Sequence, residues 1–193
     1  MRRLSGLVCA LIFSAACSEP PQKELDMAQG AIDAARAAGA EQYASKPLTE
    51  ATNSLQAARD AVAQRDYVVA LSRAVEARQQ ANEAAKRAAD GKARTRSESE
   101  AAIAAAATAL LELQQKLKAA STAKVGATDL RPASETTRKA DAALQEARAA
   151  VENGNYLEAG VAVGATRKRI SEAIRGLDEA IAARTARGTR RRR

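Results

Sequence analysis

The sequence lacks several residue types on which common active sites and folds depend. Its 193 residues include no histidine, no tryptophan, one phenylalanine, three tyrosines, two cysteines, four prolines and ten glycines. Without histidine there is no Ser-His-Asp triad, and two cysteines supply neither a tetrahedral zinc site nor a disulfide framework. So few prolines and glycines also argue against a β-sandwich, which needs a turn roughly every 8–12 residues.

Alanine fills much of the space that these residues leave, at 51 of the 193 positions. Alanine is the strongest helix former and is depleted in strands. After residue 16 the chain has only 12 Leu, 8 Val and 5 Ile, too few for a wide core. The composition therefore predicts a thin, all-α protein.

Residues 1–16 have the pattern of a secretory signal peptide. Arg2 and Arg3 form a basic start, Leu7 to Phe13 is apolar, and Ser14-Ala15-Ala16 supplies small residues for cleavage. The apolar run is too short for a transmembrane helix. Because Cys17 follows at once, the segment resembles a bacterial lipobox, except that Ser14 stands where leucine is usual. That resemblance implies a diacylglycerol on the thiol of Cys17 and an acylated amine.

The alternative is cleavage by the general signal peptidase, which would leave one free thiol in an oxidising compartment. With lipidation, buried acyl chains contribute about 0.8 kcal/mol per CH₂ and hold the protein on the membrane. By resemblance to known lipoprotein sorting signals, Ser18, a residue other than Asp, implies sorting to the outer membrane, with the body in the periplasm of a Gram-negative envelope. Residues 17–23 would be a short tether.

The body shows apolar residues at alternating spacings of three and four, which is typical of packed helices in a coiled coil. We therefore predict an elongated antiparallel helical bundle or coiled coil. The predicted seams are Leu25, Ala28, Ile32 and Ala35; Leu48, Ala51, Leu55, Ala58 and Val62; Ile103, Ala106, Leu110, Leu113 and Leu117; Ala140, Leu144, Ala147 and Val151; and Val163, Ile170, Ile174, Leu177 and Ile181.

Turn-forming residues divide this body into helices. We expect breaks between Gly39 and Pro47, at Arg65-Asp66, from Gly126 to Pro132, and at Asn153-Gly154-Asn155. Gly91 is either a turn or a glycine tolerated within one helix over 66–121. The expected organisation is a helical repeat at 24–90, a connecting long helix at 91–121, a second repeat at 122–183 and a disordered Arg-rich tail at 184–193.

An internal repeat links the two halves. Residues 55–84 align without gaps to 144–173, with 11 identities in 30 positions. Both turns and the tyrosines Tyr67 and Tyr156 fall at the same register. Duplication of a helical hairpin therefore explains the pattern.

The first copy, residues 31–84, resembles an uncharacterised bacterial family of Ala-rich helical domains. The matching features are Ala-Gly-Ala before Tyr43-Ala44, Pro47-Leu48, Leu55-x-x-Ala58 and Asp66-Tyr67-x-x-Ala70. A degenerate second copy covers roughly 117–182. The resemblance implies an envelope lipoprotein and lends no catalytic residue. Some members carry a peptidoglycan-binding OmpA-like domain; we expect none here.

The remaining candidate features favour structure over catalysis. Tyr43, Tyr67 and Tyr156 could stack on a ligand, but such residues more often pack at helix turns. Glu98 and Glu100 could take part in acid–base or metal chemistry, but between helical arginines they favour a solvated face. No phosphate-binding glycine motif occurs. We therefore expect no enzyme activity, no cofactor and no metal site.

The formal charge of +8 is concentrated at the C-terminal end. Of the 31 basic residues, two lie in residues 1–16 and six lie after residue 183, so residues 17–183 balance 23 basic against 23 acidic residues. The six are candidate contacts to an anionic surface or an acidic envelope protein; otherwise they only aid solubility. They are Arg184, Arg187, Arg190, Arg191, Arg192 and Arg193.

These observations favour an outer-membrane lipoprotein that serves as a structural or adaptor element of the envelope, its membrane contact being the lipid anchor. One alternative is a nucleic-acid-binding protein, which the overall charge suggests and the signal peptide and neutral body oppose. Another is a non-catalytic regulator of an envelope enzyme.

Overall fold

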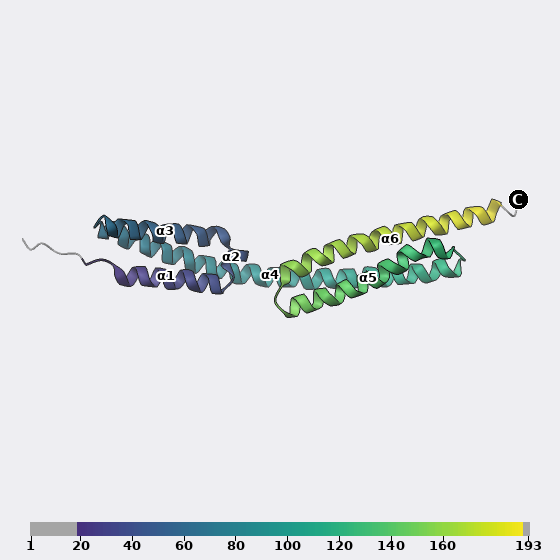
Figure 1. The fold of residues 1–193 in the computed structure, drawn as a ribbon, viewed down its shortest axis with the longest axis horizontal. Coiled ribbons are helices and arrows are strands. Elements are labelled where there is room, and N and C mark those ends of the chain that lie inside the picture. The colour runs from purple at the N-terminus through teal and green to yellow at the C-terminus, as the bar shows by residue number, and fades with distance from the viewer. Residues whose placement is uncertain (1–18, 191–193) are drawn as a thin grey trace, which may run out of the picture. The chain divides into compact units, whose positions relative to one another are not determined.

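The protein is a bundle of α-helices (Figure 1). A computed structural model describes residues 19–190, and no strand occurs in that range. The helices are α1 (Gln22–Ala37), α2 (Ala40–Tyr43), α3 (Ser45–Ala63), α4 (Tyr67–Thr122), α5 (Ala127–Glu152) and α6 (Tyr156–Arg190). The prediction of an all-α bundle is confirmed. The chain forms two compact units, unit 1 up to Ala88 and unit 2 from Ala89, and α4 contributes to both.

Unit 1 packs α1, α3 and the first part of α4 side by side in alternating directions (Figure 1). The predicted seams on α1 and α3 are buried, except that Val62 is only partly so. Polar contacts between the helices surround this core. The Arg59 guanidinium on α3 donates to Gln29 Oε1 on α1 at 2.8 Å, and the Ser54 hydroxyl donates to Gln80 Oε1 on α4 at 2.9 Å.

Unit 2 packs the second part of α4 with α5 and α6 around its own core. Residues 91–121, predicted to form a connecting long helix with a seam from Ile103 to Leu117, do connect the two units, and their seam packs in the core of unit 2. Ile103, Leu110 and Leu113 are buried against seam residues of α5 and α6. The reason is that a two-helix hairpin leaves its apolar face half covered, and this stretch of α4 supplies the third helix. The helix continues through Gly91, so that glycine is tolerated and forms no turn.

Corresponding seams differ in side-chain size between the two units. Position 81 on α4 is a fully buried alanine, whereas the equivalent position 170 on α6 is a fully buried isoleucine. The same exchange occurs between Ala74 and Val163, both also buried. The all-alanine seam of α4 in unit 1, which the sequence analysis did not identify, consists of Ala70, Ala74, Ala77, Ala81, Ala84 and Ala88.

The two hairpin turns have the same backbone geometry, which supports the duplication. In the first, the Asp66 N–H donates to the Ala61 carbonyl at 2.9 Å; in the second, the Asn155 N–H donates to the Ala150 carbonyl at 2.8 Å. The residue before each donor is left-handed: Arg65 has φ 59° and Gly154 has φ 82°. Both predicted turns are confirmed. Only the second copy has glycine at the left-handed position.

We expect that glycine at position 65 raises the free energy of unfolding and that a non-glycine residue at position 154 lowers it. Arg65→Gly should raise the free energy of unfolding by about 1 kcal/mol, because a left-handed conformation costs an L-residue about 1–2 kcal/mol. Gly154→Ala should lower it by about the same amount. An added Cβ at Gly154 meets no atom within 4 Å, so the cost comes from the backbone alone. Urea unfolding followed by circular dichroism measures both, and a destabilised Arg65→Gly would contradict this explanation.

Three predicted boundaries need correction. The tether is shorter than expected, because α1 begins at Gln22 and Glu24 lies in its first turn, where a carboxylate is favoured. The loop predicted from Gly126 to Pro132 ends at Gly126. There the Gly126 carbonyl accepts from the Asp129 and Leu130 N–H groups, so that α5 begins at Ala127 with Pro132 inside it. Finally, residues 184–190 are helical rather than disordered, because α6 continues to Arg190.

Candidate surface-binding site

The predicted site residues fall partly outside the described part of the chain. Cys17 and Arg191, Arg192 and Arg193 lie outside residues 19–190, so the structure does not test them. Arg184 and Arg187 lie on α6, and the helix ends at Arg190. The structure thus places three of the six predicted cations, Arg184, Arg187 and Arg190, on this helix.

Contacts between α4 and α6 fix how far α6 extends along unit 2. The buried Ser99 hydroxyl donates to the Tyr156 carbonyl at 2.7 Å, and Lys116 Nζ lies 2.6 Å from Asp178 Oδ1. The two helices run in the same direction, and each rises 1.5 Å per residue. Thr122, where α4 ends, is six residues after Lys116, so it lies level with residue 184, which is six residues after Asp178. The last turns of α6 therefore extend past the end of the bundle (Figure 1).

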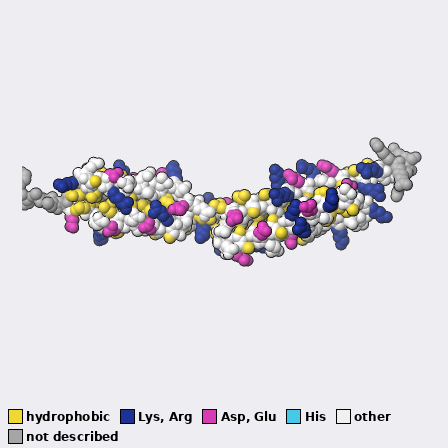
Figure 2. Space-filling view, in the orientation of Figure 1, with side chains coloured by type: hydrophobic (Ala, Val, Ile, Leu, Met, Phe, Trp, Pro, Cys, Tyr) yellow, Lys and Arg dark blue, Asp and Glu magenta, His cyan; other side chains and the backbone are white. Residues whose placement is uncertain are grey.

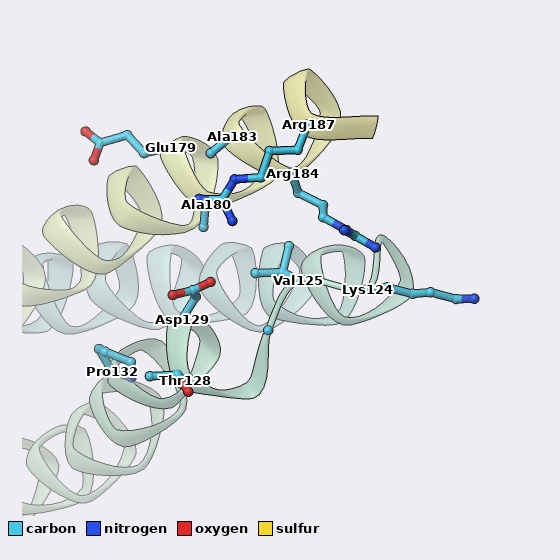
Figure 3. A pocket seen from close by; sticks show the side chains of 11 residues that line it. Lys124, Val125, Thr128, Asp129, Pro132, Glu179, Ala180, Ala183, Arg184 and Arg187 are labelled. Atoms are coloured by element: carbon cyan, nitrogen blue, oxygen red, sulfur yellow. The ribbon is translucent and has the colours of Figure 1, made fainter. Parts of the chain in front are cut away.

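A concavity of about 660 Å³ lies at this end of unit 2, beside the α4–α5 loop (Figure 3). We call it the basic-end concavity. Its apolar wall consists of Val125 and Pro132 from the loop and α5, and of Ala180 and Ala183 from α6. Five charged residues also line it: Lys124, Asp129, Glu179, Arg184 and Arg187.

Three of the five charged residues that line the basic-end concavity are cations. Arg184 extends from α6 toward the turn after α4, Arg187 extends back along α6 toward Ala180, and Lys124 points outward from its loop (Figure 3). Among the described residues, no ion pair within 4.0 Å involves any of its five charged groups, although seven ion pairs occur elsewhere. Lys and Arg side chains gather over this part of unit 2 (Figure 2). The arrangement can hold an anion, with two carboxylates on its inner side.

Lys124 was not among the predicted site residues, because the arginines were expected to form a separate disordered tail. The basic residues Lys116, Lys118, Lys124 and Arg131 around the α4–α5 turn were visible in the sequence. These residues lie at the same end of unit 2 as residues 184–187 because α4 and α6 run in the same direction. The internal repeat did not predict that direction. Lys124 itself has φ 56° and occupies a turn like those at Arg65 and Gly154.

The other candidate residues lie on helix surfaces or at turns. Glu100 on α4 pairs with Arg96 one turn earlier at 2.8 Å, and Glu98 is exposed. Tyr43, Tyr67 and Tyr156 are half-buried, the first beside the core of unit 1 and the others at the starts of α4 and α6. The acid–base candidates are therefore not brought together around a cavity.

Perturbed pKa values occur in ion pairs within single helices. The hydrogen bond from Arg87, together with its charge, lowers the pKa of Glu83, and Lys139 acts in the same way on Glu135. The hydrogen bond to Glu100 raises the pKa of Arg96. Because these groups are exposed to solvent, the solvent screens the interactions, and they support helices α4 and α5 rather than a reaction.

Two further features bear on metals and membranes. Within residues 19–190, no group of three or more His, Cys, Asp or Glu side chains is placed to hold a metal ion. None of the described helices combines the length and hydropathy needed to cross a bilayer.

The fold and this basic end define an all-α protein made of two helical units, each with three long helices or helix segments packed together. Residues 23–99 match the model of a family described as a domain of unknown function, DUF4398. This match includes residues 31–84, over which the sequence was predicted to resemble an uncharacterised family, and the resemblance is confirmed for that stretch. No curated protein and no solved structure matched the chain.

Proposed function

We propose that the protein is an outer-membrane lipoprotein that acts as a structural or adaptor element on the periplasmic face. The observation that carries this proposal is the segment Ser14-Ala15-Ala16-Cys17 after the apolar run from Leu7 to Phe13. A thiol at this place is the acceptor of the diacylglycerol in a lipobox. The anchor would hold residue 17 at the membrane surface, and the helices that begin at Gln22 would follow directly.

The described residues support an interaction role through the chemistry of their surfaces. The cores of both units are built from alanine and a few larger aliphatic residues, which leaves most polar side chains on the helix exteriors. The net charge is confined to one end, where α6 extends past the bundle. An anchored protein with one charged end suits the joining of a membrane to a second envelope component.

Metabolic labelling with palmitate tests the anchor. The wild-type protein should incorporate the label and partition into the membrane fraction, whereas Cys17→Ser should incorporate none, because the acceptor thiol is gone. Cys9→Ser is the matched control and should remain labelled, since bulky Leu7 and Val8 precede it. Equal labelling of wild type and Cys17→Ser would refute the lipoprotein assignment.

The same labelled protein tests the choice of membrane. After separation of the two membranes on a density gradient, the wild type should be found with the outer membrane. Ser18→Asp should move it to the inner membrane, because the residue after the acylated cysteine directs sorting. Labelled wild-type protein in the inner membrane would contradict the outer-membrane proposal and leave acylation standing.

A further inference from the structure

Three cations from two separate chain segments line the basic-end concavity. Lys124 comes from the α4–α5 loop, and Arg184 and Arg187 come from α6, some 60 residues later. The two arginines are three residues apart and therefore lie on neighbouring positions of the helix surface. From Ala182 to Gly188 every residue of α6 is exposed. The cations are thus accessible from outside the bundle.

The apolar and acidic residues restrict what this concavity can hold. Val125 and Pro132 line it from one side and Ala183 from the other, so that apolar surface lies directly beside the cations. Asp129 and Glu179 lie farther toward the middle of unit 2, because residue 129 follows 124 along α5 and residue 179 precedes 184 along α6. These carboxylates repel an anion from the inner side and leave the outer side open to it.

We propose that this end of unit 2 docks on a membrane surface by binding the phosphate groups of anionic phospholipids. Charge complementarity carries the choice of partner, since basic groups are attracted to an anionic lipid surface. The apolar wall suits the glycerol and upper acyl region of such a lipid. Single-stranded nucleic acid fits less well, because its binding sites stack bases on aromatic rings and no aromatic residue lines the concavity.

This inference rests on the proposed function in one respect: the proposed function places the protein in a compartment where it meets phospholipid. Its test uses residues 17–193 with Cys17→Ser, so that no acyl chain contributes to binding. Sedimentation with vesicles of phosphatidylglycerol should recover the protein, and vesicles of phosphatidylcholine should not. Binding should weaken from 0.05 to 0.5 M NaCl, because salt shortens the range of the attraction.

Matched charge variants separate this site from the net charge. The triple variant Lys124→Gln, Arg184→Gln and Arg187→Gln should lose at least tenfold in vesicle affinity, since each contribution of about 1 kcal/mol corresponds to about fivefold. The control removes three exposed cations elsewhere on α6, as Arg167→Gln, Lys168→Gln and Arg175→Gln, and should stay within about twofold. Circular dichroism should show equal helix content in both variants.

Three outcomes would overturn the inference. They are equal losses in the two triple variants, no binding to phosphatidylglycerol by the unsubstituted chain, and tighter binding of an oligonucleotide that the site variant alone abolishes. None of these outcomes affects palmitate labelling at Cys17. Failure of this inference is therefore distinguishable from failure of the lipoprotein proposal.

Discussion

Ile170→Ala is expected to lower the free energy of unfolding by about 2–5 kcal/mol, the range for removing a large aliphatic side chain from a packed core. Ile170 on α6 is fully buried and belongs to the core of unit 2, with Leu113 and Leu144 from the other two helices. Because alanine already occupies many neighbouring seam positions, few large side chains are present to fill the resulting cavity. The loss should fall toward the upper part of that range.

Urea unfolding of the chain, followed by circular dichroism, measures this loss. Leu111→Ala is a suitable control, because Leu111 lies on α4 in the same unit but is 59% exposed. Exposed substitutions usually change stability by less than about 0.5 kcal/mol. A similar effect of the two substitutions would show that position 170 is not part of a packed core.

Ala81→Ile is expected to destabilise the protein by about 1–3 kcal/mol, although isoleucine occupies the equivalent position 170 of the second copy. Ala81 is fully buried on the all-alanine seam of α4 in unit 1. The same core already contains larger residues of the other helices, including Ile32 on α1 and Leu55 on α3. An isoleucine there would force the helices apart or take an unfavourable rotamer.

The control for this prediction is Ala93→Ile on the same helix, where the alanine is exposed. It reports the lower helix propensity of isoleucine without overpacking and should cost about 0.5 kcal/mol. Thermal unfolding followed by circular dichroism compares the two variants. If Ala81→Ile were as stable as the original chain, the seam of unit 1 would not be closely packed.

The two copies of the hairpin have the same register but different cores. The register is shared: Leu55 and Leu144 are both buried, and both turns have the same hydrogen bonds. The third helix differs, being α1 in unit 1 and the second part of α4 in unit 2. Because the third helix differs, the buried side chains also differ in size: Ala74 and Ala81 on α4 correspond to Val163 and Ile170 on α6.

The location of the basic residues could be predicted only in part. The sequence places six arginines after residue 183 and a neutral body before them. It does not say that Arg184 and Arg187 are helical, because the arginine run interrupts the heptad pattern after Ile181. In the structure, α6 continues through them, and cations near a helix C-terminus are favoured by its dipole.

The sequence by itself determined the fold class, most of the seam residues and both hairpin turns. These features depend on local propensity and on the spacing of apolar residues, which can be counted along one chain. The proposed lipid anchor at Cys17 also rests on the sequence alone, since the lipobox that it resembles is a linear motif.

Only the tertiary structure decided which helices the seam of residues 103–117 packs against, and that Lys124 and Arg184 line the same concavity. Both facts depend on which helix faces cover one another and in which direction the helices run. An alanine-rich helix has small side chains on several faces, so its apolar pattern does not single out one partner. That choice is made by contacts between helices, such as the hydrogen bond from Ser99 to the Tyr156 carbonyl.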